Sequence, residues 1–215
     1  MNQKIIFNKI DFEAILVLNG EISHFDYIQE NKGIIYAADG AANRLFKNNI
    51  VPDFIIGDLD SLELDKFNSK SKTTKIIKDD SQDTNDFEKT LNLILSHNKS
   101  NILIFGMQGG ELEHTLNNWS VLKKFEKKLN LTVLHNNRYA IPIYKSIEFI
   151  LKVNELISII PQPNCKIKTS GLKWELDNET LELGIREGAR NIVIQEKISI
   201  ELISGEYLLF IDSRS

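Results

Sequence analysis

Residues 52–61 read PDFIIGDLDS, a short apolar run that ends in two carboxylates. The apolar part, Phe54–Ile56, lies between a proline and a glycine, which is typical of a short buried strand. Asp58 and Asp60 therefore follow the carboxyl end of that strand. In open α/β sheets this edge is where ligands bind, so the stretch indicates a candidate site as well as a strand.

The spacing of these carboxylates raises the question of what balances their charge. Asp58 and Asp60 are separated by one leucine, and such neighbours repel unless a cation or a proton lies between them. Mg²⁺, a divalent ion that prefers oxygen ligands, fits this requirement. The alternative is that Asp60 caps the following helix and Asp58 lies in a solvated turn, where aspartate is common.

Apolar strands and amphipathic helices alternate on both sides of this stretch. Further strands are predicted at 14–18, 33–38, 74–77, 102–105 and 131–134, and helices at 23–30, 41–48, 62–67, 86–96 and 114–128. The predicted buried faces are Phe87, Leu91, Ile94 and Leu95 on one helix, and Leu116, Trp119, Leu122, Phe125 and Leu129 on another. This alternation indicates a doubly wound, mostly parallel α/β sheet.

The pattern changes from about Asn137 onward, where no helix is predicted. Short apolar runs take over, at 147–151, 156–160, 166–168, 180–183, 191–194, 198–202 and 206–211, with turn signals such as 204–205 between them. Such spacing is typical of an antiparallel β-sandwich or barrel. We therefore expect two domains, an α/β domain over 1–137 and a β-sandwich over 138–215.

Composition narrows the class of protein. The 215 residues are 42% hydrophobic and 26% charged, which is ordinary for a globular protein. A net charge of −4 does not favour nucleic acid as a partner, and no apolar run approaches the roughly 20 residues that span a bilayer. The N-terminus becomes charged too soon for a signal peptide. The single cysteine, Cys165, excludes an internal disulfide and fits a cytoplasmic location, and the four scattered histidines do not indicate zinc.

Five aspartates fall at or just after the carboxyl ends of predicted strands: Asp39, Asp58, Asp60, Asp83 and Asp86. Parallel connectivity brings these ends to one edge of the sheet, where so much negative charge needs a cation. Each residue also has a local explanation. Asp39 begins a common Asp-Gly turn, and the segment before Asp86 has the spacing of a helix capping box.

Mg²⁺ in proteins usually completes its shell with waters and substrate phosphates, so the acidic residues suggest a nucleotide substrate. The sequence contains no Walker-type phosphate loop. Residues 106–110, GMQGG, can present backbone amides to a phosphate. A plain tight turn explains this segment nearly as well.

Taken together, these motifs resemble the thiamine pyrophosphokinase family. The motifs occur in family order: ADGAAN at 38–43, PD at 52–53 with GDLDS at 57–61, QDTNDFE at 82–88, and GMQGG at 106–110 with HTLNN at 114–118. SGLKWEL at 170–176 is similar to the family's thiamine-pocket motif. The resemblance implies transfer of the terminal pyrophosphoryl group of ATP to the hydroxyl of thiamine, with release of AMP. It also implies an α/β nucleotide domain, a thiamine-binding β-sandwich, and a homodimer with sites at the subunit interface.

The resemblance assigns a role to each matching residue. Mg²⁺ ligands are expected at Asp39, Asp58, Asp60 and Asp83, and catalytic carboxylates at Asp58, Asp60, Asp83 and Asp86, with Asp86 or Asp83 handling the hydroxyl proton. ATP contacts are expected from Asp39, Asn43, Gln82, Thr84, Gly109, His114 and Asn118. Thiamine contacts are expected from Ser170 and from Trp174, whose ring would stack on the cationic acceptor. From the residues alone, Trp174 is explained as well by a core aromatic.

Two segments depart from the family pattern and leave other functions open. The family's Gly-Gly-Arg-x-Asp-His turn reads GGELEH at 109–114, so Glu111 reverses a charge beside a polyanion and Glu113 lengthens a carboxylate. The family's Ser-x-Ser-Asn reads GARN at 188–191, where Arg190 offers a charge for a phosphate. The alternatives are a pyrophosphokinase for another heterocyclic alcohol, such as a pterin, and a non-catalytic thiamine- or nucleotide-binding protein.

Overall fold

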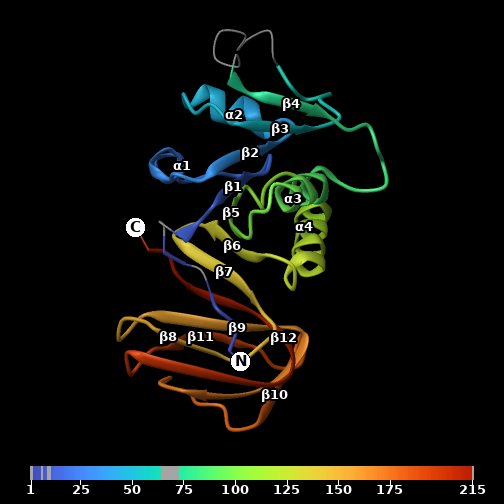
Figure 1. The fold of residues 1–215 in the computed structure, drawn as a ribbon. Coiled ribbons are helices and arrows are strands. Elements are labelled where there is room, and N and C mark those ends of the chain that lie inside the picture. The colour runs from blue at the N-terminus through green and yellow to red at the C-terminus, as the bar shows by residue number, and fades with distance from the viewer. Residues whose placement is uncertain (1, 6, 9–10, 64–72, 215) are drawn as a thin grey trace. The chain divides into compact units, whose positions relative to one another are not determined.

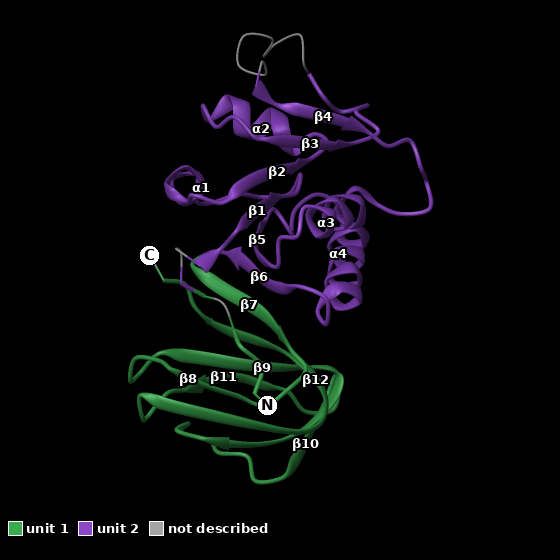
Figure 2. Ribbon diagram, viewed as in Figure 1, with its two compact units in different colours: residues 1–7, 137–214 green, residues 8–136, 215 purple. Residues whose placement is uncertain are grey.

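The computed structural model describes residues 2–5, 7–8, 11–63 and 73–214, and Figure 1 shows their arrangement. The chain divides into two compact units, coloured separately in Figure 2. The α/β unit comprises residues 8–136, and the β unit comprises 137–214 with the described residues of the segment 2–7. Within the described residues, no helix has both the length and the apolar character needed to cross a membrane.

The α/β unit is built on a parallel sheet, as predicted. Its strands are β1 (Ala14–Val17), β2 (Ile34–Ala38), β3 (Phe54–Gly57), β4 (Lys75–Lys78), β5 (Asn101–Phe105) and β6 (Asn130–His135). They lie in the order β6-β5-β1-β2-β3-β4, and every neighbouring pair is parallel. The chain order reverses at β1, which pairs with β2 on one side and β5 on the other. This switch point is where a doubly wound sheet opens a crevice for ligands.

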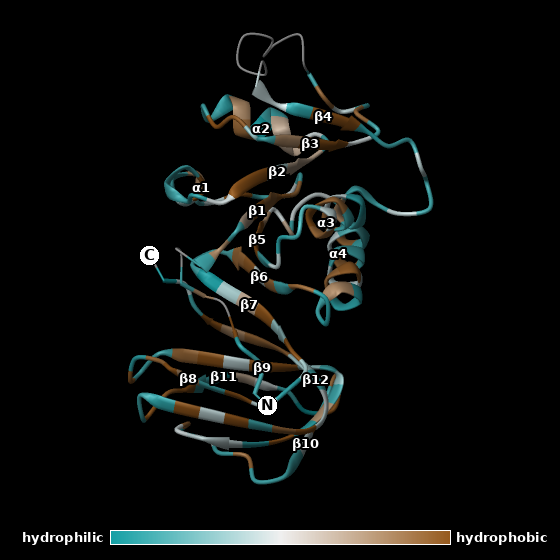
Figure 3. Ribbon diagram, in the orientation of Figure 1, coloured by the Kyte–Doolittle hydropathy of each residue, from teal (hydrophilic) through white to brown (hydrophobic). Residues whose placement is uncertain are grey.

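Four helices accompany the sheet: α1 (Phe25–Glu30), α2 (Ala41–Lys47), α3 (Asp86–Ser96) and α4 (Leu112–Phe125). The apolar strands are brown in Figure 3, and all four residues of β1 are buried because helices and neighbouring strands cover them. At the start of α3, the Asn85 side chain accepts a hydrogen bond from the Glu88 N–H at 2.9 Å, which confirms the predicted capping.

The buried face of α4 differs from the prediction. Leu116 is predicted in the buried stripe, but it is 62% exposed, so that assignment is wrong. The buried stripe begins later, at Val121, because the first half of α4 borders a polar cleft instead of covering the sheet. The helix predicted at 62–67 falls largely outside the described residues.

The β unit is antiparallel throughout, as predicted. Its strands are β7 (Arg138–Ile143), β8 (Ile147–Ile150), β9 (Leu156–Ser170), β10 (Glu179–Glu182), β11 (Gly188–Ile192) and β12 (Lys197–Asp212). The first half of β9 pairs with the second half of β12. This half of β9 also pairs with β11, and this half of β12 also pairs with β7. Their other halves pair with β10 and β8. The two long strands therefore link β7 and β11 to β8 and β10.

Ser204–Gly205, predicted as a turn between two strands, lies inside the single strand β12, and this prediction is wrong. The register with β9 shifts on both sides of it. Gly205 has a φ of 81°, and a Cβ there would lie 2.2 Å from the carbonyl oxygen of Asn164. A left-handed glycine marks a β-bulge as readily as a turn, and the sequence does not distinguish them.

The N-terminal segment joins the β unit, although the sequence analysis included it in the first domain. The Gln3 N–H donates to the carbonyl of Ser146 at 2.8 Å. The Gln3 side chain donates to the carbonyl of Pro142 and accepts from the Tyr144 N–H, each at 2.9 Å. These bonds satisfy backbone groups at the end of β7 and just beyond it.

Candidate active site

A cleft of about 510 Å³ opens at the carboxyl ends of β1, β2, β3 and β5, and all of its lining residues belong to the α/β unit. We call it the acidic cleft. Eight of the predicted site residues line it: Asp39, Asp58, Gln82, Thr84, Asp86, Gly109, His114 and Asn118. Asn43, Asp60 and Asp83 are not among its lining residues, and Ser170 and Trp174 lie in the β unit.

Three carboxylates gather at the floor of the cleft. Asp39 follows β2, Asp58 follows β3 and Asp86 is the first residue of α3. One oxygen from each lies within 4.8 Å of the others. Three negative charges at this distance repel strongly unless a cation is present, and oxygen ligands in this number suit a divalent metal ion. Within the described residues, Asp60 and Asp83 do not belong to this cluster, although both were predicted as ligands.

Asp39 provides the clearest sign that the cluster suits a cation. It is only 8% exposed, and its buried Oδ1 has no hydrogen-bond partner among the described residues. Its backbone is fixed, because the Asp39 N–H donates to the carbonyl of Ile56 at 2.8 Å. A buried acceptor without a partner is costly. The donor set therefore fits a metal ion.

Gly57 allows the three carboxylates to approach each other. A Cβ at this position would lie 2.8 Å from the Cβ of Asp39 and 3.4 Å from the Cγ of Asp86. Any larger residue would push these side chains apart. Downstream, Leu59 adopts a φ of 68°, which is uncommon for a bulky residue, and the Asp60 N–H donates to Oδ1 of Asp58 at 3.3 Å. This turn orients the Asp58 carboxylate.

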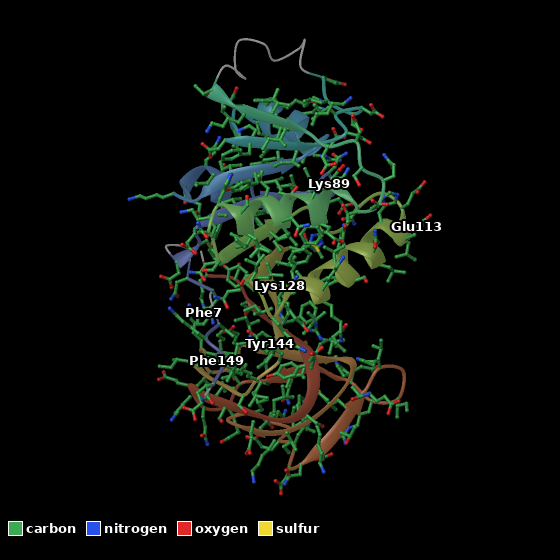
Figure 4. All side chains as sticks on the ribbon, turned by 45° about the vertical axis from the view of Figure 1, so that its right-hand side comes forward. Phe7, Lys89, Glu113, Lys128, Tyr144 and Phe149 are labelled. Carbon is green, nitrogen blue, oxygen red and sulfur yellow. The ribbon has the colours of Figure 1, made fainter. Side chains whose placement is uncertain are left out.

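Lys89 is a cleft residue that the sequence analysis missed; Figure 4 labels it on α3. Its side chain is 5% exposed, and Nζ donates to the Asp79 carbonyl at 2.8 Å and to Oδ1 of Asp86 at 3.3 Å. Burial raises the pKa of Asp86, the hydrogen bond and charge of Lys89 oppose that rise, and the charges of Asp39 and Asp58 add to it. The i,i+3 spacing of Asp86 and Lys89 was the signal available in the sequence.

Three predicted residues of the α/β unit, Asn43, Asp60 and Asp83, are not among those that line the acidic cleft. The Asn43 amide donates to the carbonyl of Ser61 at 2.7 Å and accepts from the Glu63 N–H at 3.0 Å, so it holds the segment that follows Asp60. Asp60 and Asp83 are exposed. In these positions solvent screens their charges more than it screens the buried carboxylate of Asp39.

The glycine-rich turn packs its backbone against the segment that follows β1. A Cβ at Gly106 would lie 2.1 Å from the Leu18 carbonyl oxygen, and φ at Gly106 is 72°. The Asn118 side chain donates to the Met107 carbonyl at 3.1 Å and so supports the turn from α4. Glu111, the charge-reversed position, pairs with His114 at 3.3 Å on the exposed rim. The negative charge therefore has a local partner.

In the β unit, the Trp174 loop (residues 170–176) presents an aromatic ring to the surface. Trp174 is 55% exposed, so its interpretation as a core aromatic is wrong. The Lys173 ammonium lies 4.8 Å from the ring centroid, within cation–π range. Ser170 is exposed at the end of β9. Arg190, on β11, lines a separate hollow of about 390 Å³ within the β unit.

Comparison with known proteins agrees with this arrangement. Residues 25–134 match the catalytic domain of thiamin pyrophosphokinase, and residues 141–205 match its vitamin B1 binding domain. Thiamine pyrophosphokinase 3 of Oryza sativa subsp. japonica is 29% identical over 92% of this chain and 85% of its own. The crystal structure of the Candida albicans enzyme superposes with a TM-score of 0.82 at 20% identity, over 97% of this chain and 91% of that one. The Bacillus subtilis structure gives 0.80 at 19%, over 94% and 99%. The chain therefore belongs to the thiamin pyrophosphokinase family.

Proposed function

We propose that the acidic cleft binds ATP with Mg²⁺ and that the chain transfers the terminal pyrophosphoryl group to thiamine, giving thiamine diphosphate and AMP. Family membership gives the overall activity. The observation that carries the site assignment is the cluster of Asp39, Asp58 and Asp86, with its buried unpartnered oxygen. A protein that only binds nucleotide has little use for three converging carboxylates.

The three clustered carboxylates are the proposed ligands of the metal ion, in place of the set predicted from the sequence. When bound, Mg²⁺ offsets negative charge on the transferred group and on the departing AMP. Lys89 adds a buried positive charge next to Asp86. The backbone of residues 106–110 is proposed to hold phosphate oxygens, with Gln82, Thr84 and His114 as further contacts to the nucleotide.

The reaction forms one bond to phosphorus and breaks another. The hydroxyl oxygen of thiamine bonds to the β-phosphorus of ATP, and the bond from that phosphorus to the oxygen it shares with the α-phosphorus breaks. AMP departs with this oxygen and the electron pair. Asp86, which Lys89 holds at the edge of the cluster, is the carboxylate assigned to orient the hydroxyl and accept its proton.

The acceptor end of the site is proposed to lie on the Trp174 loop. The indole offers an exposed face of the kind that attracts a cationic thiazolium ring, and Ser170 offers a hydroxyl to the pyrimidine. The family resemblance further implies a homodimer with sites at the subunit interface and a cytoplasmic location. Sedimentation at the concentrations used in enzyme assays tests the homodimer.

Trp174→Ala tests the acceptor assignment. We expect the KM for thiamine to rise about 30-fold, because stacking and cation–π contact are lost, while the KM for ATP stays unchanged. Trp174→Phe keeps part of the stacking and should give an intermediate value. A rise in the KM for ATP instead would place the indole near the nucleotide and contradict the assignment.

The decisive experiment measures AMP release from ATP and Mg²⁺, with and without thiamine. The wild type should form AMP only with thiamine, and Asp58→Asn should lower the rate by about 10³-fold because a ligand charge is lost. Asp26→Asn is the matched control, since this aspartate is exposed on α1 outside the cleft. AMP release with a pterin alcohol but not with thiamine would favour the alternative acceptor. ATP binding without any turnover would favour a binding protein.

A further inference from the structure

We propose that Asn191 is a positioning residue that holds the Trp174 loop in the conformation that receives the acceptor ring. The proposal rests on the proposed function of Trp174. Asn191 is 8% exposed, and its side chain contacts the backbone of Trp174 twice. Nδ2 donates to the Trp174 carbonyl at 2.7 Å, and Oδ1 accepts from the Trp174 N–H at 3.1 Å.

The residues on either side of Trp174 are fixed by other bonds. The Lys173 N–H donates to the carbonyl of Ile192 at 2.8 Å. The Glu175 carboxylate accepts from the Leu172 N–H at 2.8 Å and from the Thr169 hydroxyl at 2.6 Å. These bonds close the loop without involving the backbone of Trp174 itself. Both polar backbone groups of that one residue are bonded to the Asn191 amide.

The contrast between a fixed backbone and an exposed ring is what points to a binding role. A half-exposed indole gains little stability from its own packing, so the two bonds from Asn191 to its backbone are what hold this position of the loop in place. A ring held in its binding orientation loses less conformational entropy when a ligand stacks on it. Asn191 would therefore act through Trp174 on acceptor affinity and leave the acidic cleft unaffected.

The chain offers a matched control for this idea. Ser158 is 9% exposed, and its hydroxyl accepts from the Arg190 N–H at 2.9 Å, one residue before Asn191. Ser158→Ala therefore removes a buried side-chain contact to the backbone of β11 without touching Trp174. Asn191→Ala removes both bonds to Trp174 and the bond that Oδ1 accepts from the Ile192 N–H at 2.8 Å. Asn191→Asp keeps the acceptor for the Trp174 N–H but brings a buried negative charge against the Trp174 carbonyl, so it is a second disruptive variant.

Two measurements test the proposal independently of each other. In a Trp119→Phe parent, Trp174 is the only tryptophan of the chain, and its fluorescence anisotropy decay reports how freely the indole moves. Steady-state kinetics in the wild-type background report the KM for thiamine, the KM for ATP and kcat. We expect Asn191→Ala to increase indole motion and to raise the KM for thiamine about fivefold, with kcat and the KM for ATP unchanged. Asn191→Asp should change both quantities at least as much, and Ser158→Ala should match the wild type.

The outcomes separate the positioning role of Asn191 from the proposed function. Unchanged indole motion in Asn191→Ala overturns the positioning role. Increased motion with an unchanged KM for thiamine overturns the link to the acceptor, and a wild type that makes no AMP with thiamine overturns the proposed function instead. Equal changes in all three kinetic constants, or the same change in Ser158→Ala, would show a general structural role and also overturn the proposal.

Discussion

The acidic cleft and the Trp174 loop place side chains by different means. In the α/β unit, Asp39, Asp58 and Asp86 are far apart in sequence, yet each lies where a strand has just ended or a helix begins, and parallel connectivity brings these points to one edge. In the β unit, Asn191 meets Trp174 from the short strand β11, whose pairing with β9 shifts register between Gly188 and Asn191. In a parallel sheet, the ends of the strands in the sequence predict which residues meet in the site. In an antiparallel sheet, the same prediction also requires the register and the positions of the bulges.

The largest expected effect is that of Asp39→Asn on the acidic cleft. We expect the rate of thiamine-dependent AMP formation to fall about 10³-fold, because a buried ligand charge is lost. We also expect the metal-free protein to become more stable by about 1 kcal/mol, since the substitution removes repulsion within the cluster. Urea unfolding with and without Mg²⁺ measures the second effect.

Asp39→Asn is expected to lower the reaction rate and to raise the stability of the metal-free protein, so the two measurements change in opposite directions. Mg²⁺ should stabilise the wild type and have little effect on the variant, because stabilisation by a ligand follows its affinity for the folded state. A variant that loses stability and still responds to Mg²⁺ would indicate that Asp39 is a structural residue.

Much of the α/β unit could be predicted from the sequence, because buried parallel strands read as apolar runs and their ends carry the site. The pattern could not say which aspartates turn inward. Asp83 precedes the helix and is exposed, whereas Asp86, three residues later, lies in the cluster. That choice depends on the phase of α3 and on the space left by Gly57, which are tertiary properties. Lys89 was missed because a lysine on a helix is usually solvated.

In the β unit, the antiparallel class could be predicted but the strand count could not. The glycine at 205 reads as a turn, and only pairing with β9 reveals a continuous strand with a bulge. The Trp174 loop was found by resemblance alone, since an aromatic residue among short strands is usually part of a core. Its partner Asn191 carries no local signal, because the contact joins residues 17 positions apart.

Gly205→Ala is expected to have the next largest effect, on the stability of the β unit. The added Cβ would lie 2.2 Å from a backbone oxygen in a left-handed conformation, and we expect a loss of about 3 kcal/mol. Gly184→Ala is a matched control, because φ is 83° there but no atom lies within 4 Å of the added Cβ, so only about 1 kcal/mol of backbone strain is expected.

The two tryptophans, Trp119 and Trp174, lie in different units, so single-tryptophan variants can report the unfolding of each unit by fluorescence. Gly205→Ala should shift the transition seen by Trp174 more than the one seen by Trp119. If Gly205→Ala and Gly184→Ala lower the unfolding free energy equally, the cost at Gly205 comes from its positive φ alone, and the steric explanation fails.

A smaller effect of opposite sign is expected for Tyr207→Phe in the β unit. The buried Tyr207 hydroxyl has no hydrogen-bond partner in the part of the chain that the structure describes, and burial raises its pKa well above the usual range. Phenylalanine keeps the ring and removes the unsatisfied group, so we expect a gain of about 1 kcal/mol in unfolding free energy. Urea titration followed by Trp174 fluorescence measures it. A loss of stability would mean that the hydroxyl has a bound partner in solution.

The smallest effect is expected for Glu13→Gln, in the α/β unit. Glu13 lies just before β1, at the opposite end of the strand from the acidic cleft. Its carboxylate accepts from the Ser100 N–H and the Ser100 hydroxyl, each at 2.9 Å, and from the Asn101 N–H at 3.1 Å. These bonds, led by the Ser100 N–H, hold the pKa of Glu13 below its ordinary value of 4.5. The amide cannot replace an anion that accepts three hydrogen bonds, and solvent exposure limits the cost to about 0.5 kcal/mol at pH 7.

The pH dependence of this difference follows from the direction of the shift. Because the folded-state pKa of Glu13 lies below the unfolded-state value, its contribution is complete above pH 4.5 and disappears as the pH falls through the folded-state pKa. Urea unfolding of both proteins at pH 7 and at pH 3, followed by Trp119 fluorescence, should show a gap that closes in acid, whereas an equal gap at both pH values would exclude the charge as its cause. The same residue class thus has opposite effects at the two ends of one sheet. A carboxylate bonded at the amino end stabilises the fold, whereas the three carboxylates crowded at the carboxyl end repel each other, and the proposed metal ion relieves that repulsion.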